Sequence, residues 1–206
     1  MSETTHKLTT DTNTSQAYSD LFGVAGFVDV ETTGLNPNYD EIIELSLYLF
    51  EFRKDNGEIL RIVEKYTGLR EPSIPISIGA QRVNNITYEE LKDKRLDIQH
   101  IECLIDKAEF LIAHNASFDR GFLSRLIDKC NNKTWLCSIN NIDWKGKGFK
   151  SRALGNLLNS HGIFTSRAHR AEDDVCAAIK LLSLKTQNGK TYFYEMLKNA
   201  NYCICD

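Results

Sequence analysis

The order and spacing of the apolar segments predict an α/β fold built on a mixed β-sheet. Three strand-type segments come first, at residues 24–30, 41–52 and 58–67. Two short apolar runs, at 109–113 and 134–138, then alternate with segments of helical spacing. Strands that lead into a mixture of strands and helices are typical of a sheet with helices packed on its faces.

The residues before the first strand, MSETTHKLTTDTNTSQAYSD, are rich in Ser and Thr. They hold too few apolar side chains to offset the entropy lost on ordering, so we expect residues 1–20 to be disordered. Residues 21–206 show no linker and no internal repeat. A segment of this length predicts a single folded domain with a substantial core.

The first half of this domain reads as an antiparallel sheet. The strand VAGFVDV at 24–30 is followed by the long β-type run EIIELSLYLFEF at 41–52. Asp55-Asn56-Gly57 is a turn signal. The alternating segment 58–67 then completes a hairpin or meander.

The second half reads as helices separated by short strands. Two prolines interrupt the chain, and apolar residues then recur at helical spacing in 96–108. After the buried strand 109–113, apolar residues step by four and predict an amphipathic helix within 114–129, capped by Asn115 or Ser117. Further helices are predicted at 152–162, 171–185 and 191–200.

The composition limits the classes of protein and site. Hydrophobic residues make up 42%, charged residues 26%, and the net charge is −3. Binding to a polyanion would therefore need a local basic patch or bound metal ions. The six cysteines include no C-x-x-C pair and no Cys/His spacing suited to zinc. No signal peptide and no apolar run near the ~20 residues of a membrane span occur. We expect a cytoplasmic protein with reduced thiols and no membrane partner.

Two acids interrupt the first strand. Residues i and i+2 of a strand face the same way, about 7 Å apart, so Asp29 and Glu31 project from one face while Val28 and Val30 point to the other. Burying two unpaired anions is costly. Two explanations stay open: the strand ends at Val28 and both acids are solvated at a turn, or they face a divalent cation.

Three more residues belong to the same pattern. Asp119 and Asp174 each fall in the first turn of a predicted helix, where an acid also complements the helix dipole. His169 lies five positions before Asp174 in the loop SRAHRAEDD. Each residue alone is more often structural. The combination of a strand D-x-E, a helix-start Asp and a His-x4-Asp points to metal chemistry.

FVDVETTGL (27–35), HNASFD (114–119) and HRAEDD (169–174) resemble, in order, the three motifs of the DEDDh 3′–5′ exonucleases. That family includes the proofreading epsilon subunit of bacterial DNA polymerase III, ribonuclease T and oligoribonuclease. The segment EPSIPISIGAQRVNNIT also resembles the stretch between the first two motifs. The resemblance covers about residues 24–184 and implies a ribonuclease H-like fold, a mixed five-stranded sheet flanked by α-helices.

By position, the resemblance implies four carboxylates that hold two divalent metal ions, Mg²⁺ or Mn²⁺, and a histidine general base. The metal-binding and catalytic acids are Asp29, Glu31, Asp119 and Asp174, and the base is His169. Asp173 competes with Asp174, but the His-x4-Asp spacing selects Asp174. Two such metals form a clamp for in-line displacement at phosphorus.

The resemblance also implies a substrate site around the first two motifs. The backbone near Thr32 is expected to bind the terminal 3′ nucleotide, and Leu35 to wedge between the last two bases. Gly34 permits a tight turn and a close approach of backbone to ligand. For Phe118 a core position is an equal alternative, and for His114 hydrogen bonding within the loop. The expected substrate-binding set is Thr32, Thr33, Gly34, Leu35, His114 and Phe118.

Basic residues are concentrated in two places. The loop NIDWKGKGFKSR at 141–152 interleaves Lys and Arg with Trp144 and Phe149. Such a loop can hold a single strand, or its charges can simply be solvated. Arg167 and Arg170 flank the histidine and could touch phosphates.

The leading interpretation is a metal-dependent 3′–5′ exonuclease, a phosphodiester hydrolase that releases nucleoside monophosphates from single-stranded DNA ends. An exoribonuclease acting on RNA tails or short oligonucleotides is the alternative, because no residue identifiable in the sequence reads a 2′-OH. A non-catalytic nucleic-acid-binding or polymerase-associated module ranks lower, since all five catalytic positions hold the expected residue types. The short stretch after Asp174 favours a stand-alone nuclease, although a separate DNA polymerase chain could recruit it.

Overall fold

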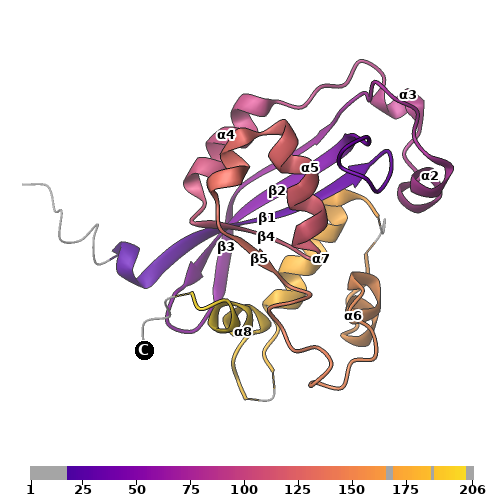
Figure 1. Cartoon of the computed structure of the whole chain (residues 1–206). Coiled ribbons are helices and arrows are strands. Elements are labelled where there is room, and N and C mark those ends of the chain that lie inside the picture. The colour runs from indigo at the N-terminus through magenta and orange to yellow at the C-terminus, as the bar shows by residue number, and fades with distance from the viewer. Residues whose placement is uncertain (1–17, 166–168, 187, 203–206) are drawn as a thin grey trace, which may run out of the picture.

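The computed structural model describes residues 18–165, 169–186 and 188–202, which form a five-stranded mixed sheet flanked by helices (Figure 1). The strands are β1 (Phe22–Thr32), β2 (Ile42–Arg53), β3 (Ile59–Leu69), β4 (Phe110–Ala113) and β5 (Trp135–Cys137). Their order is β3-β2-β1-β4-β5. The first three strands pair antiparallel, while β4 pairs parallel with β1 and with β5. The predicted fold class is confirmed.

The helices follow the prediction where the apolar spacing is strong. They are α2 (Ile78–Asn84), α3 (Tyr88–Leu91), α4 (Ile98–Lys107), α5 (Ala116–Leu126), η1 (Asp128–Asn132, a 3-10 helix), α6 (Leu154–Ser160), α7 (Ala171–Leu182) and α8 (Tyr192–Asn199). The sequence prediction missed α2, α3 and η1, which are short. In α2, Ile78 and Val83 are 71% and 48% exposed, so this helix has no buried apolar stripe to detect.

The two faces of β1 pack against different helices. Val28 and Val30 belong to a core with α4 and α5, whereas Ala25 and Phe27 belong to a core with α7 and α8. Side chains alternate along a strand, so Asp29 continues the series of Ala25 and Phe27. The acids of β1 therefore lie on the face that α7 covers, beyond the last apolar residue.

An aromatic cluster fixes α8 against the other end of that face. The ring centroids of Phe193 lie 5.3 Å from Phe50 and 5.0 Å from Phe52, in edge-to-face geometry. Each such pair contributes about 0.5–1.5 kcal/mol beyond its area burial. The core is therefore concentrated away from the acids, and their end of the face is left polar.

The aromatic residues of the 141–152 loop are part of this core. Trp144 is fully buried, and its indole Nε1 donates a hydrogen bond to the Ser138 carbonyl at 2.7 Å. Its ring packs on Tyr192 with centroids 4.7 Å apart, and Phe149 packs edge-on against it. These rings hold the loop on the domain, and Trp144 is too deeply buried to stack on bases.

Several predicted features lie outside the described residues. The segment 1–17, Arg167, Cys203 and Cys205 are among them. Residues 18–21, at the end of the predicted disordered segment, are helical, and the Tyr18 hydroxyl donates to Glu51. Among the helices that the structure describes, none combines the length and apolar character needed to cross a bilayer.

Candidate active site

β1 continues through both acids of the first motif. The strand runs to Thr32, so the alternative of an earlier strand end with both acids at a solvated turn is wrong. Across the sheet, Asp29 is opposite Ser46 and Glu31 is opposite Glu44 of β2. Directly opposed residues point to the same side of a sheet. This end of the face therefore carries a continuous polar patch.

Asp119 reaches β1 because β4 is much shorter than β1. The parallel pairing ends at Phe27 with Ile112, and the chain then turns into α5. Past that point the Val30 N–H donates to Asp119 Oδ1 at 3.2 Å. Asp119 is only 4% exposed. The acid thus lies at the carboxyl ends of parallel strands, where ligands bind in open α/β sheets.

α7 brings the third motif to the same end of the sheet. Carboxylate oxygens of Glu31 and Asp174 and a ring nitrogen of His169 all lie within 4.8 Å of one another. The His169 backbone N–H donates to Asp174 Oδ2 at 3.2 Å, and its φ of +63° lets the loop turn into the helix. Asp173 instead lines a separate small cavity with Phe164. The geometry therefore groups Asp174, and not Asp173, with Glu31.

Burial raises the pKa values of all four acids, and repulsion among them adds to the effect at Asp29 and Glu31. Burial raises the pKa of Asp29 well above its usual range, and the charges of Asp119, Glu31 and Asp174 raise it further. Burial and the Asp174 charge raise the pKa of Glu31 to about 8. Burial raises the pKa of Asp119 to about 7 and also raises that of Asp174, where His169 opposes the effect. The cluster therefore retains protons near neutral pH unless positive charge is supplied.

The donor set fits hard divalent cations. Mg²⁺ and Mn²⁺ prefer carboxylate oxygens, and the charges that act on Asp29 all come from other acids. Within the described part of the chain, no lysine or arginine forms an ion pair with Asp29, Glu31, Asp119 or Asp174. A buried anionic cluster that no lysine or arginine of the described residues pairs with is the arrangement that bound cations stabilise.

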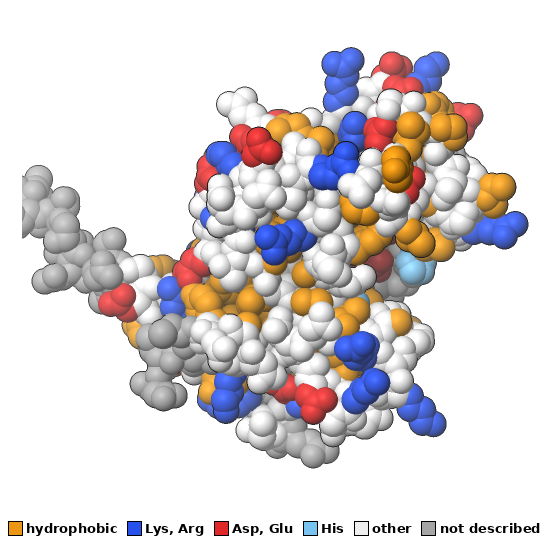
Figure 2. Space-filling view, viewed as in Figure 1, with side chains coloured by type: hydrophobic (Ala, Val, Ile, Leu, Met, Phe, Trp, Pro, Cys, Tyr) orange, Lys and Arg blue, Asp and Glu red, His pale blue; other side chains and the backbone are white. Residues whose placement is uncertain are grey.

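An apolar pocket of about 410 Å³ opens beside Glu31. α2 contributes Ala80 and Val83 to its lining, and Leu35 and Phe118 also line it. Figure 2 shows the corresponding side of the molecule hollowed, with acidic and histidine side chains in a recess between two projecting parts. The volume falls in the range of about 300–1,000 Å³ typical of small-molecule sites.

Some residues of the turn after β1 line the pocket, and others support the turn itself. Thr32, Gly34 and Leu35 line the pocket. Thr33 is fully buried, and its hydroxyl donates to Asp40 at 3.2 Å. A Cβ at Gly34 would lie 2.4 Å from the Asp40 carboxylate. The glycine is therefore required by a close approach within the chain itself, and Thr33 holds the turn rather than lining the pocket.

His114 is engaged within the protein on both sides of its ring. Its Nδ1 and Nε2 lie 2.8 Å from the Ser138 hydroxyl and the Arg152 carbonyl, and burial lowers its pKa. A carbonyl only accepts, so Nε2–H donates to it and Nδ1 accepts from the hydroxyl. Both ring nitrogens are therefore occupied by partners within the protein.

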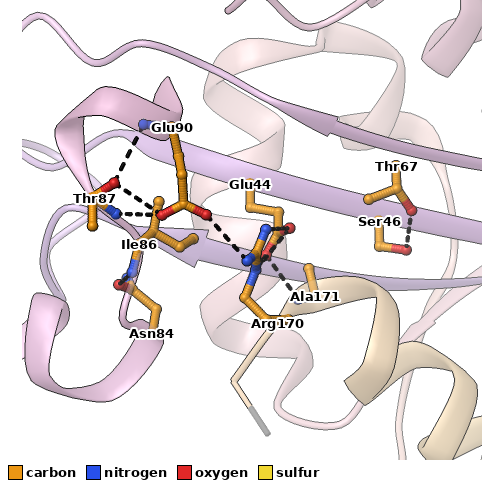
Figure 3. Close-up of polar contacts among 9 residues, drawn as sticks. All are labelled: Glu44, Ser46, Thr67, Asn84, Ile86, Thr87, Glu90, Arg170 and Ala171. Carbon is orange, nitrogen blue, oxygen red and sulfur yellow. Dashed lines mark hydrogen bonds and ion pairs between the residues drawn. The ribbon is translucent and has the colours of Figure 1, made fainter. Parts of the chain in front are cut away.

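Sequence reasoning missed a fifth acid. Glu44, 3% exposed, accepts hydrogen bonds from the Arg170 side chain and from the Ala171 N–H. Arg170, which the sequence suggested for phosphate contact, is held by Glu44 and Glu90 (Figure 3). The available signal was a lone acid inside the long apolar run EIIELSLYLFEF.

Comparisons with known proteins identify the family of this chain. The RNase_T model, described as exonuclease, matches residues 27–182. A PolC-type DNA polymerase III from Thermotoga maritima is 29% identical over 197 residues, which covers 86% of this chain and 13% of that protein. The 3′–5′ exonuclease DinG from Staphylococcus aureus is 26% identical over 181 residues, which covers 85% of this chain and 19% of that protein. The chain thus spans less than a fifth of either relative.

Solved structures show the same fold. E. coli exonuclease I in complex with a dT13 oligonucleotide matches with a TM-score of 0.62 and 19% identity, over 78% of this chain and 40% of that chain. Exonuclease X in complex with 5′ overhanging duplex DNA matches with a TM-score of 0.51 and 20% identity, over 82% of this chain and 99% of that chain.

Proposed function

This chain belongs to the exonuclease family, and we propose that it is a metal-dependent 3′–5′ exonuclease that hydrolyses single-stranded DNA ends to nucleoside monophosphates. The observation that carries the proposal is the convergence of three distant segments at one end of the sheet. Glu31 of β1, Asp119 of α5 and Asp174 of α7 meet there beside Asp29, with His169 at the mouth.

Asp29, Glu31, Asp119 and Asp174 would hold two divalent cations, Mg²⁺ or Mn²⁺. When bound, such a pair supplies charge stabilisation for in-line displacement at phosphorus. The raised pKa values of Glu31 and Asp119 support this role, since cations would allow both acids to ionise.

His169 would accept the proton of the attacking water. Imidazole is the usual general base near neutral pH, and this ring is exposed at the mouth of the acidic cluster. The base must lie within hydrogen-bond reach of the proton it removes. Its position within 4.8 Å of Glu31 and Asp174 is compatible with a water held between these groups.

The apolar pocket would take the terminal base of the strand. Leu35 is 84% exposed at its rim and Phe118 lines it, so both offer apolar surface for stacking. Thr32 and Gly34 would face the terminal nucleotide from the turn, with Thr33 and His114 supporting the site indirectly.

DNA is favoured because one relative is named a DNA polymerase and the two structural neighbours described above are complexes with DNA. RNA is the alternative.

The test is an end-labelled single strand offered as DNA and as RNA. With Mg²⁺ or Mn²⁺ we expect a ladder that shortens from the 3′ end and releases nucleoside monophosphates, and no cleavage with EDTA. The double variant Asp29→Asn, Glu31→Gln is the inactive control. Faster processing of RNA would select the exoribonuclease alternative. Processing of neither strand would support a non-catalytic scaffold.

Two further parts of the proposal concern the setting of this chain. Association with a DNA polymerase is supported by the PolC-type relative. A cytoplasmic location is supported by the free thiols of Cys103, Cys130, Cys137 and Cys176. Co-purification of the full chain with a tagged polymerase, and fractionation of cells, test these two points.

A further inference from the structure

We propose that Glu44 and Arg170 are positioning residues that hold His169 and Asp174 over Glu31, so that cation binding depends on them. This inference deepens the proposed function and rests on it. Neither residue belongs to the three motifs as a ligand or base, and neither lines the apolar pocket. Their contacts connect β2 to the first turn of α7.

Glu44 holds the start of α7 with both carboxylate oxygens. Arg170 Nε donates to Oε1 and Oε2 at 3.2 and 3.1 Å, and Arg170 Nη2 donates to Oε1 at 2.9 Å. The Ala171 N–H donates to Oε2 at 3.0 Å. Figure 3 shows the carboxylate of Glu44 and the guanidinium of Arg170 facing each other across this junction. Several hydrogen bonds between one guanidinium and one carboxylate fix the relative orientation of the two groups as well as their distance.

The helix has no cap of its own at this point. Arg170 occupies the N-cap position of α7 and makes no side-chain cap hydrogen bond, because a guanidinium cannot accept one. The first N–H groups of a helix need acceptors, and an acid near them is favourable. Glu44 supplies that acceptor from a strand far away in the sequence. α7 is therefore capped by the sheet that carries the first motif.

The sheet register links the contact between Glu44 and α7 to the positions of the side chains in the candidate site. Glu44 lies directly opposite Glu31 on the neighbouring strand, where side chains are typically about 5 Å apart at Cβ. The first turn of α7 is closed by the hydrogen bond from the Asp174 N–H to the Arg170 carbonyl at 3.0 Å. Glu44 thus sets where Asp174 and the preceding His169 stand relative to Glu31.

Arg170 carries the connection on to the pocket wall. Its Nη1 lies 3.5 Å from Glu90 Oε1, while Glu90 Oε2 accepts from the Thr87 N–H and completes the capping box of α3. α3 follows α2, whose last residue, Asn84, donates to the Thr32 carbonyl at 3.4 Å. The metal-binding end of α7 and the wall of the apolar pocket therefore share one polar connection.

A positioning role and a purely electrostatic role predict opposite changes in cation affinity when Arg170 is substituted. Removing the negative charge of Glu44 weakens cation binding in either case. Removing the positive charge of Arg170 strengthens cation binding if only the electrostatic field matters. If Arg170 positions α7, its removal weakens cation binding. The sign of the Arg170 effect therefore separates the two explanations.

The experiment is a Mn²⁺ titration of the full chain without nucleic acid, read from the electron paramagnetic resonance signal of free Mn²⁺. We expect Glu44→Gln and Arg170→Gln each to weaken binding about tenfold or more, as supporting residues around metal ligands do. The loss of Mn²⁺ affinity in the double variant should be smaller than the product of the two single losses. Arg170→Lys should recover part of the affinity that Arg170→Gln loses. Arg61→Gln is the matched control, since Arg61 pairs with Glu51 at the other end of β2.

Activity adds a second readout. On single-stranded DNA, kcat should fall with the Mn²⁺ affinity while KM changes little. If Arg170→Gln does not fold, Arg170→Lys decides, because lysine keeps the positive charge but loses the fork of hydrogen bonds to Glu44. A loss of Mn²⁺ affinity of about two- to fivefold is then expected.

Unchanged or tighter Mn²⁺ binding by Arg170→Gln, or by Arg170→Lys where it decides, overturns the inference while the wild-type chain still binds and cleaves. A wild-type chain that neither binds Mn²⁺ nor cleaves overturns the proposed function and this inference together.

Discussion

Binding of Mn²⁺ to the four acids at pH 7 should release protons to the solvent. Burial raises the pKa of each acid in the metal-free protein, and repulsion from nearby acids adds to this effect at Asp29, Glu31 and Asp174. A cation binds the ionised form, so each proton retained by the metal-free cluster must leave when the cation arrives. The number released therefore reports the electrostatics of the cluster directly.

The magnitude follows from the individual pKa values. With a pKa of about 8, Glu31 carries about 0.9 proton at pH 7, and with a pKa of about 7, Asp119 carries about half a proton. Asp29, whose pKa is raised well above its usual range, adds up to one more. We therefore expect release of roughly 1.5 to 2.5 protons for a filled site at pH 7.

Isothermal titration in two buffers of different ionisation heat measures this number. As a second measure, the logarithm of the Mn²⁺ affinity should rise with pH at a slope equal to the protons released. The slope should be about 2 near pH 7 and should decrease above pH 8, where Glu31 is already ionised.

Two variants test the assignment of the protons. Glu31→Gln should reduce the release at pH 7 by about one proton. Asp128→Asn makes the same kind of change at an exposed position on η1 and should leave it unaltered. A slope near zero at pH 7 would refute the reasoning, because it would mean that the acids are ionised without any cation.

Four other outcomes are expected. The melting temperature of the metal-free protein should fall as pH rises from about 5 to 8, because Glu31, with its pKa raised to about 8, favours the folded state only while protonated, and scanning calorimetry with and without Mn²⁺ checks this. His169→Ala should lower kcat by about 10²-fold with Mn²⁺ affinity nearly unchanged, and a collapse of that affinity would instead make His169 a metal ligand. Leu35→Ala should raise KM for single strands several-fold without a change in melting temperature, since Leu35 is 84% exposed. Trp144→Ala should destabilise the domain by about 3–5 kcal/mol in urea titrations, because the indole is fully buried and its Nε1 bonds the Ser138 carbonyl.

Much of the fold could be predicted because its main signals are local. The alternation in 58–67 and the four-residue steps after 114 each depend on neighbours in sequence, and they correspond to β3 and α5. The antiparallel pairing of the first strands and the mixed sheet followed from such local patterns, and the five-stranded sheet followed from the family resemblance. The weak elements were missed for the same reason. In α2, Val83 lines the open pocket and Ile78 is 71% exposed, so neither side chain is buried in a core.

The motifs identify the candidate site residues in the sequence. They do not show which of these residues line the pocket and which support its wall. Leu35 and Phe118 line the apolar pocket. Thr33 and His114 do not, because Thr33 holds Asp40 and His114 holds the Arg152 carbonyl. These partners lie seven and 38 positions away along the chain. No local pattern distinguishes a side chain that faces a pocket from one that supports the wall behind it.

Glu44 shows the physical basis of that limit. It shares one face of the sheet with Asp29 and Glu31, is the same residue type as Glu31, and is buried like Asp119. Composition and strand spacing therefore describe all of these acids alike. What separates them is the partner: Glu44 meets the guanidinium of Arg170, whereas the charges that act on Asp29 are all acidic. An acid with a basic partner holds the structure in place, and an acid without one remains available to a cation.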